Sequence, residues 1–297
     1  MSQLNTEQRA AVTQISGPML VLAGAGSGKT RVITEKIAYL IRGRHFRPAQ
    51  ISAVTFTNKA AREMRARVAA LGNEQTADGP FISTFHQLGL RILRTEYHRL
   101  GYRRGFSIFD AADSLSQVRE ILKQDGHAMN GAAEAAAARI SAWKSTLVGP
   151  DEAAQKAADP LELQAARVYA RYVESLKAYN GLDFDDLITA PVTLLRDDAE
   201  VRGQWQARLG YLLVDEYQDT NGAQYEMMRL LVGAEPNFTV VGDDDQSIYA
   251  WRGARPENLV QLKQDYPDLA VVKLEQNYRS SGRILSAANR LIANNPH

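Results

Sequence analysis

Apolar residues along the chain gather into short, nearly continuous runs separated by polar and glycine-rich stretches. Several runs have the length and β-branched content of a strand: MLVLAG, ISAVTFT, FISTFH, YLLVDE, FTVVGD and AVVKLEQ. Apolar runs without alternation are typical of a parallel sheet covered on both faces. Segments with helical spacing, such as RVITEKIAYLIRG, lie between many of them. The pattern therefore predicts an α/β fold with a parallel sheet built from βαβ units.

Strand-like runs disappear between about Leu88 and Arg196, where segments such as GAAEAAAARISAWK and LQAARVYARYVESLKAY have helical spacing. We therefore expect an all-helical subdomain, residues 88–196, inserted into a sheet domain made of residues 1–87 and 197–277. The acidic stretch LDFDDL is interpreted as the start of a helix that returns from the insertion. Its carboxylates are Asp183, Asp185 and Asp186.

Composition removes several classes of chemistry. The 297 residues contain no cysteine, which excludes disulfides, thiolate zinc sites, iron–sulfur clusters and a cysteine nucleophile, and fits a reducing compartment. The five histidines are scattered, so no separate metal site is expected. The N-terminus lacks a signal-peptide core, and no window is apolar enough to span a membrane. We expect a soluble, cytoplasmic protein with no membrane partner.

Charge gives a weaker indication. The net charge of +1 identifies no acidic partner, so any nucleic-acid surface would have to be a local stripe. Basic residues do cluster on one expected helix and in the segment after the next strand: Lys59, Arg62, Arg65, Arg67, Arg91, Arg94, Arg99, Arg103 and Arg104. Such a run is usually a solvated face; the alternative is a set of salt-sensitive contacts to a nucleic-acid backbone.

The clearest chemical signal is LVLAGAGSGKT, residues 20–30, where an expected strand leads through a glycine-rich loop into a helix. Glycines let backbone N–H groups converge on an anion, and the lysine and hydroxyl that come next suit outer phosphates and Mg²⁺. Ala23 replaces the first glycine of the usual GxxxxGK[ST] pattern. A dinucleotide-binding GxGxxG loop is disfavoured because Lys29 occupies its third glycine position. A glycine-rich turn without a ligand is the other alternative.

Two further motifs come after the ends of expected strands. YLLVDEYQDT delivers Asp215, suited to the Mg²⁺ shell, and Glu216, suited to orient or deprotonate a water. The alternative, an acidic helix N-terminus, is disfavoured because TFTNK, STFH and GDDDQ also follow strand ends, where open α/β sheets bind ligands. VGDDDQSIYAWRGA places Gln246 close to Tyr249 and Trp251, which would stack bases or else belong to the core.

Seven motifs occur in one order: LNTEQ, AGAGSGKT, TFTNKAAREM, STFH, DEYQDT, GDDDQSIYAWRGA and QNYRS. In that order they resemble the superfamily-one DNA helicases of the UvrD, PcrA and Rep group, and RGARPENL, EQNYRSSGRIL and LIANNPH favour the Rep branch. The resemblance implies a RecA-like P-loop NTPase fold. It also implies ATP-driven movement along single-stranded DNA from 3′ to 5′, with duplex unwinding, in DNA replication or repair.

The resemblance assigns roles residue by residue. Nucleotide binding is implied for Gln8, which would recognise adenine, and for Ala23, Gly24, Ala25, Gly26, Ser27, Gly28, Lys29, Thr30, Arg31, Tyr278 and Arg279. Catalysis is implied for Lys29, Asp215, Glu216, Gln246 and the arginine finger Arg279, and Mg²⁺ binding for Thr30 and Asp215. DNA contacts are implied for Thr55, Phe56, Asn58, His86, Tyr249, Trp251 and Arg252.

The position of the last residue shapes the expected activity. Helicases of this group have two RecA-like domains with ATP between them, and the sequence stops at His297, so we expect residues 278–297 to begin the second one. An arginine finger is worth about 10³ to 10⁵ in rate. We therefore expect a monomer that binds ATP, Mg²⁺, single-stranded DNA and single-strand/duplex junctions, with slow hydrolysis and no unwinding. Replication or repair proteins are expected partners of the parent; the alternative is a non-hydrolysing binding or docking module.

Overall fold

The chain forms two compact units. The computed structural model describes residues 4–72, 79–126, 131–250 and 253–294. The first of the two units, called the sheet unit, comprises residues 1–84, 204–220 and 231–297. The second, called the helical unit, comprises residues 85–203 and 221–230. The domain limits expected from the sequence stay a prediction; the helical unit also includes residues 221–230, which were predicted to belong to the sheet domain.

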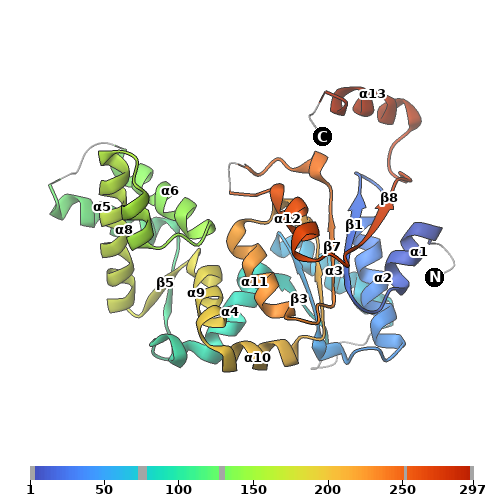
Figure 1. The fold of residues 1–297 in the computed structure, drawn as a ribbon, viewed down its shortest axis with the longest axis horizontal. Coiled ribbons are helices and arrows are strands. Elements are labelled where there is room, and N and C mark those ends of the chain that lie inside the picture. The colour runs from blue at the N-terminus through green and yellow to red at the C-terminus, as the bar shows by residue number, and fades with distance from the viewer. Residues whose placement is uncertain (1–3, 73–78, 127–130, 251–252, 295–297) are drawn as a thin grey trace. The chain divides into compact units, whose positions relative to one another are not determined.

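A six-stranded sheet forms the centre of the sheet unit (Figure 1). Its order is β3–β2–β6–β7–β1–β8, and every pairing among these strands is parallel. The strands are β1 (Pro18–Ala23), β2 (Ile51–Thr55), β3 (Phe81–Thr84), β6 (Tyr211–Val214), β7 (Phe238–Gly242) and β8 (Ala270–Leu274). In the centre, Leu20 of β1 pairs with Val240 of β7 and with Val271 of β8. The expected α/β fold with a parallel sheet is confirmed.

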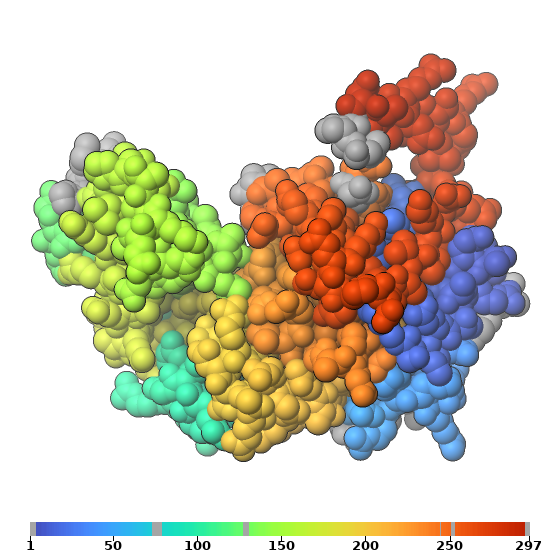
Figure 2. Space-filling view, in the orientation of Figure 1, coloured from blue at the N-terminus to red at the C-terminus, as the bar shows by residue number. Residues whose placement is uncertain are grey.

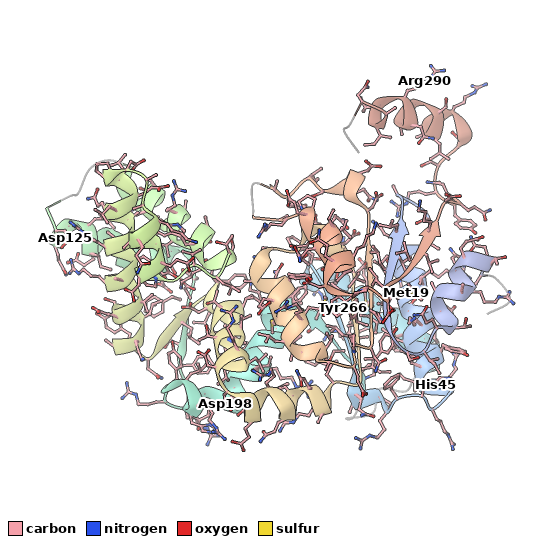
Figure 3. All side chains as sticks on the ribbon, viewed as in Figure 1. Met19, His45, Asp125, Asp198, Tyr266 and Arg290 are labelled. Atoms are coloured by element: carbon pink, nitrogen blue, oxygen red, sulfur yellow. The ribbon has the colours of Figure 1, made fainter. Side chains whose placement is uncertain are left out.

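The core of this unit forms where helices cover the sheet. Met19 and Val21 of β1 belong to one fully buried cluster with Ile33 and Ile37 (Figure 3 labels Met19). Alternate strand residues and helical residues four apart share one face, so both patterns deliver apolar side chains to the same layer. The helices described in this unit are α1 (Thr6–Thr13), α2 (Lys29–Arg42), α3 (Asn58–Ala70), α12 (Glu257–Asp265) and α13 (Gly282–Ile292).

A buried lysine fixes the position of α1. Lys36 of α2 is fully buried, and its Nζ donates to the carbonyl oxygens of Ala11 and Gln14, each at 2.7 Å. These carbonyls lie at the C-terminal end of α1, where a helix leaves acceptors unsatisfied and where the helix dipole favours a cation. The contact therefore ties α1, which carries Gln8, to the helix that comes after the glycine-rich loop.

The helical unit consists mainly of α4 (Phe85–Glu96), α5 (Ala111–Gln124), α6 (Ala132–Ser145), α7 (Pro150–Lys156), α8 (Pro160–Ala178) and α9 (Asp186–Asp197). Helices α10 (Ala199–Arg208) and α11 (Gly222–Val232) begin in it and end in the sheet unit. A pair of parallel strands also occurs in this unit, β4 (Ser107–Phe109) with β5 (Gly181–Asp183). The prediction that the insertion is helical throughout is therefore wrong in this detail. Strands of three residues are shorter than the runs by which a strand is recognised in a sequence.

An ion cluster inside the helical unit joins β5 to α9 and α6. Lys144 Nζ contacts Asp183 Oδ2 and Asp186 Oδ1, each at 2.7 Å, and its side chain is 2% exposed. Burial by itself would lower the pKa of Lys144, but the carboxylates of Asp186 and Asp183 outweigh it and raise the pKa. Asp183 Oδ1 also accepts from Asp186 N at 2.9 Å, so the expected helix start at LDFDDL is confirmed.

Helix α13 is the most exposed element of the sheet unit. None of its residues is buried, and Ile284 and Leu291 are 60% and 74% exposed. Figure 2 shows it as a projection from the surface. That residues 278–297 begin a second RecA-like domain stays a prediction. Within the described ranges, none of the helices combines the length and the apolar character that crossing a membrane requires.

We predict that Gly89→Ala destabilises the helical unit. A Cβ at this position of α4 would lie 1.7 Å from the carbonyl oxygen of Leu187, so α4 and α9 would have to separate. The expected loss is about 1 to 3 kcal/mol in the free energy of unfolding, measured as a lower melting temperature by circular dichroism. The matched control is Gly203→Ala in α10, where a Cβ would meet no atom within 4 Å. That change should stabilise by about 0.5 to 1 kcal/mol, and equal melting temperatures for the two variants would contradict the prediction.

Candidate active site

The glycine-rich loop connects the end of β1 to the start of α2. β1 ends at Ala23 and α2 begins at Lys29, so residues 24–28 form the loop that the sequence predicted. Gly26 and Gly28 have φ values of +74° and +91°, a left-handed conformation that side chains with a Cβ rarely adopt. Gly28 is also the N-cap of α2 and provides no side-chain cap. The first N–H groups of α2 therefore lie at the loop, which suits an anion.

Gln8 supports the loop from the N-terminal helix. Its side chain is 1% exposed; Nε2 donates to the Ser27 carbonyl at 2.9 Å, and Oε1 accepts from Asn5 N at 3.2 Å. A Cβ on Gly28 would lie 2.8 Å from Gln8 Nε2, so glycine is needed for this contact as well as for its backbone angle. The expected role of Gln8 in adenine recognition stays a prediction.

The acidic pair comes after β6 and meets the loop lysine. Lys29 Nζ contacts Glu216 Oε2 at 3.0 Å, with 10% of the lysine side chain and 37% of the glutamate side chain exposed. Glu216 has φ 51° and ψ 48°, a left-handed conformation that is uncommon for residues other than glycine and is often found at functional sites. The sequence predicts that the glycine-rich loop and the acidic pair lie at the same edge of the sheet. In the structure, Lys29 and Glu216 are in direct contact there.

The buried carboxylates at this edge of the sheet would be stabilised by additional positive charge. Burial, and after it the neighbouring Glu216 charge, raises the pKa of Asp215 to about 7. The same two causes raise the pKa of Asp219 to about 6, and its Oδ1 is buried without a hydrogen-bond partner among the residues described. Carboxylate and hydroxyl oxygens are ligands that Mg²⁺ prefers. Asp215 and Thr30, the second residue of α2, therefore fit the Mg²⁺ that the sequence predicted.

The turn after β7 joins the same cluster. Gln218 Nε2 donates to Glu216 Oε2 at 2.9 Å, and Gln218 Oε1 accepts from Asp243 N at 3.1 Å. The Asp243 carboxylate in turn accepts from Gln246 Nε2. Gln246 is thus linked to Glu216 by a chain of hydrogen bonds. Gln218 was not predictable from the sequence, because a glutamine inside an acidic motif has no distinctive spacing.

The segment after β8 crosses the glycine-rich loop. Tyr278 N donates to the Gly26 carbonyl at 2.9 Å, and Asn277 Nδ2 donates to the Ala25 carbonyl. A Cβ on Gly26 would lie 2.7 Å from Arg279 Cβ, so only glycine, which has no side chain, fits at this position. Tyr278 and Arg279, both exposed, therefore lie beside the loop. Arg31 is half-buried in the first turn of α2.

Four of the expected DNA contacts lie in the sheet unit, near the ends of β2 and β7. The Thr55 hydroxyl is buried and, within the described part of the chain, has no hydrogen-bond partner. Phe56 stacks on Tyr249 with ring centroids 5.4 Å apart and 21° between the planes, and Asn58 is exposed at the start of α3. The other two expected contacts of the motif after β7, Trp251 and Arg252, lie outside the described residues.

The helical unit holds the remaining expected DNA contact, His86. Its ring stacks on Phe184 with centroids 4.0 Å apart and 22° between the planes, and Phe184 is 57% exposed. Burial lowers the pKa of His86 to about 4, so the imidazole is neutral near pH 7. The pair is therefore a flat, uncharged surface. No role for Phe184 was predicted, although an aromatic residue inside the acidic stretch LDFDDL is a visible signal in the sequence.

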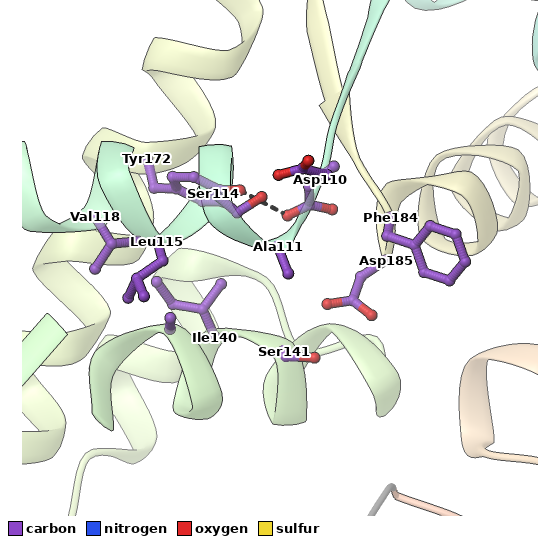
Figure 4. Close-up of a pocket in the computed structure, with 12 residues that line it drawn as sticks. Asp110, Ala111, Ser114, Leu115, Val118, Ile140, Ser141, Tyr172, Phe184 and Asp185 are labelled. Atoms are coloured by element: carbon purple, nitrogen blue, oxygen red, sulfur yellow. Dashed lines mark hydrogen bonds between the residues drawn. The ribbon is translucent and has the colours of Figure 1, made fainter. Parts of the chain in front are cut away.

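A cavity of about 470 Å³ lies in the helical unit between α5 and α6 (Figure 4). Leu115, Val118 and Ile140 form part of its apolar lining, and Ser141 and Asp185 supply polar groups. Burial and the nearby Asp183 charge raise the pKa of Asp185 to about 6. Among the residues that the structure describes, none that the sequence predicted to bind nucleotide or DNA lines this cavity, although Phe184 does.

The sequence of the chain matches a known protein family and several named proteins. A family model described as the UvrD/REP helicase N-terminal domain matches residues 4–267. The chain is 56% identical to the ATP-dependent DNA helicase Rep of Escherichia coli K12, over 99% of the chain and 44% of that protein. It is 44% identical to the ATP-dependent DNA helicase PcrA of Staphylococcus aureus Mu50, over 99% of the chain and 40% of that protein. The chain thus spans less than half the length of these relatives.

We predict that Asp215→Asn stabilises the metal-free protein increasingly as pH rises. The raised pKa of Asp215 means that its contribution to stability is fully present below its unfolded value, near 4, and is lost as pH rises through about 7. The stability difference between the variant and the parent should grow by about 2 kcal/mol between about pH 5.5 and about pH 8, measured by thermal melting with EDTA. Asp219 is present in both proteins, so its own titration largely cancels. A difference that stays constant across this range would contradict the prediction.

Proposed function

The chain belongs to the UvrD/REP helicase family, and from that premise we propose that it is the ATP-binding half of a DNA helicase. We propose that the whole protein hydrolyses ATP with Mg²⁺, moves along single-stranded DNA from 3′ to 5′, and unwinds duplexes at single-strand junctions in the cytoplasm. The names of its relatives, ATP-dependent DNA helicase Rep and PcrA, support this class of activity. The observation on which the proposal mainly rests is the ion pair between Lys29 and Glu216.

The contacts suggest how the site works. In the structure Lys29 neutralises Glu216, and a bound triphosphate would offer the lysine a stronger set of oxygens in its place. Glu216 would then be free to accept a proton from the attacking water. The N–H groups at the start of α2 would bind the phosphates, and Arg279 lies beside the loop to contact them. Bound Mg²⁺, held by Thr30 and Asp215, would neutralise phosphate charge.

Base stacking is the proposed mode of DNA binding. Phe56 and Tyr249 in the sheet unit, and His86 and Phe184 in the helical unit, form two stacked aromatic pairs. Aromatic surfaces bind bases of any sequence, because every base has a π face, and this suits a protein that moves along DNA. The turn that contains Gln246 leads directly to Tyr249 and Trp251, so one segment would contact both ATP and DNA.

A binding module without turnover is the second candidate. It is favoured by the same ion pair, because a glutamate held by a lysine is not yet available as a base. In that case the chain would bind nucleotide or single-stranded DNA, but replacing Lys29 would change no reaction. Hydrolysis measurements therefore separate the two candidates.

We predict that Lys29→Ala lowers ATP hydrolysis by about 10² to 10³ fold, because removing one preorganised electrostatic group at the reacting phosphates has that effect. The measurement is phosphate release with Mg²⁺, with and without single-stranded DNA. Lys263→Ala in α12 is the matched control, since this lysine is exposed and belongs to none of the seven ordered motifs. DNA-stimulated hydrolysis that persists in Lys29→Ala would contradict the enzyme proposal. Nucleotide binding with no turnover in the parent would favour the binding module.

We also predict that Trp251→Ala weakens binding of oligothymidylate by about 1 to 3 kcal/mol, as expected for loss of one stacked base. Fluorescence anisotropy with a labelled oligonucleotide measures this, and the melting temperature should stay unchanged. Trp205→Ala shows how a core tryptophan behaves, because Trp205 is 6% exposed and its loss should cost about 3 to 5 kcal/mol of stability. If Trp251→Ala lowered the melting temperature and left binding intact, Trp251 would be a core residue.

A further inference from the structure

A buried glutamine connects two strand ends of the sheet unit. Gln218 lies in the 3₁₀ turn Tyr217–Asp219 after β6 and is 2% exposed. Its carboxamide donates from Nε2 to Glu216 Oε2 at 2.9 Å and accepts at Oε1 from Asp243 N at 3.1 Å. Both ends of the amide are therefore used, one on the acidic pair after β6 and the other on the turn after β7.

The orientation of this amide is fixed by its two partners. A carboxylate only accepts hydrogen bonds, and a backbone N–H only donates them. Rotating the carboxamide by half a turn would place Oε1 against the Glu216 carboxylate and Nε2 against the Asp243 N–H. Both contacts would then be repulsive inside a buried site, where unpaired polar groups cost most.

Packing against β7 holds the amide in place. A Cβ on Gly242 would lie 3.0 Å from Gln218 Oε1 and 3.4 Å from Gln218 N, so the last residue of β7 leaves room for the side chain because it is glycine. The next residue continues the network: the Asp243 carboxylate accepts from Gln246 Nε2, and also from Asp245 N at 3.2 Å. Glu216 and Gln246 are thereby joined through Gln218 and Asp243.

Glu216 depends on this contact most when nucleotide is bound. In the structure Lys29 and Gln218 both donate to the same atom, Glu216 Oε2. Once Lys29 turned to the phosphates, Gln218 would still hold the carboxylate. The Glu216 side chain is 37% exposed and starts from a left-handed backbone, so without a donor it would be free to swing away from the attacking water.

We infer that Gln218 is a positioning residue of the ATP site, which holds the Glu216 carboxylate in register with the turn that carries Gln246. The inference rests on the proposed function and deepens it. A displacement of residues 243–246, whether caused by phosphate at Gln246 or by DNA further along the same segment, moves the Asp243 N–H and with it Gln218 and Glu216. The Gln218 amide would thus connect DNA binding to the position of Glu216, the group that activates the attacking water.

The test replaces Gln218 with methionine, which has similar volume and makes neither hydrogen bond. Single-turnover hydrolysis of Mg²⁺–ATP should slow about 10 to 100 fold, the cost of a misplaced catalytic group, while ATP affinity changes by less than about 3 fold. Stimulation by oligothymidylate should fall toward none. Gln218→Glu is the second variant: it keeps an acceptor for the Asp243 N–H but sets a carboxylate against Glu216, and it should be at least as slow.

Gln224→Met is the matched control. Gln224 is also buried, at 5% exposure, and its side chain caps α11 by accepting from Asn221 N at 3.0 Å. The control should lower the melting temperature and leave the hydrolysis rate and its DNA stimulation unchanged. If Gln218→Met behaved like Gln224→Met while Glu216→Gln abolished hydrolysis, the inference would fail and the proposed function would stand. If the parent showed no hydrolysis sensitive to Glu216→Gln, the proposed function would fail and the inference with it.

Discussion

The parallel alignment of β1, β6 and β7 is the constraint on which the whole candidate site depends. Parallel strands end at the same edge of a sheet, so the segments after them must meet there. The glycine-rich loop, the Asp215–Glu216 pair and the turn of residues 243–246 come after these three strands in the structure. If β6 ran the other way, its acidic pair would lie at the opposite edge, and Lys29 could not reach Glu216.

The electrostatics of this edge are unbalanced in a way that suits a ligand. Lys29 faces Glu216, Asp215 and Asp219, and Arg67 adds positive charge near Asp215, but burial still raises the pKa of both aspartates. Buried carboxylates without enough positive charge cost stability, and active sites are where such costs are tolerated. A metal-bound triphosphate would bring cation and anion together, so that Lys29 could leave Glu216 without depriving that carboxylate of nearby positive charge. The left-handed backbone of Glu216 is a second local cost at the same place.

The sequence was sufficient to predict the features that depend on the local pattern of apolar and polar residues. Apolar runs and the residues after them were sufficient to predict the parallel sheet, the loop at residues 24–28 and the acidic pair, because the end of a strand positions the residues next to it in the chain. Contacts between distant segments were not predictable in this way. Asn277 contacts Ala25 across 252 positions of sequence, and nothing in either residue indicates the other. Lys144 is a similar case, because a lysine in an alanine-rich helix does not indicate two aspartates about 40 residues later.

In the proposed mechanism, Lys29 is shared between Glu216 and the phosphates of a nucleotide bound at the glycine-rich loop. A crystal structure of the chain with Mg²⁺ and a non-hydrolysable ATP analogue tests this most directly. We expect Lys29 Nζ to leave Glu216 for the outer phosphates, with Thr30 and Asp215 at the metal and Gln218 still hydrogen-bonded to Glu216. An analogue bound elsewhere, with the 3.0 Å contact between Lys29 and Glu216 intact, would contradict it.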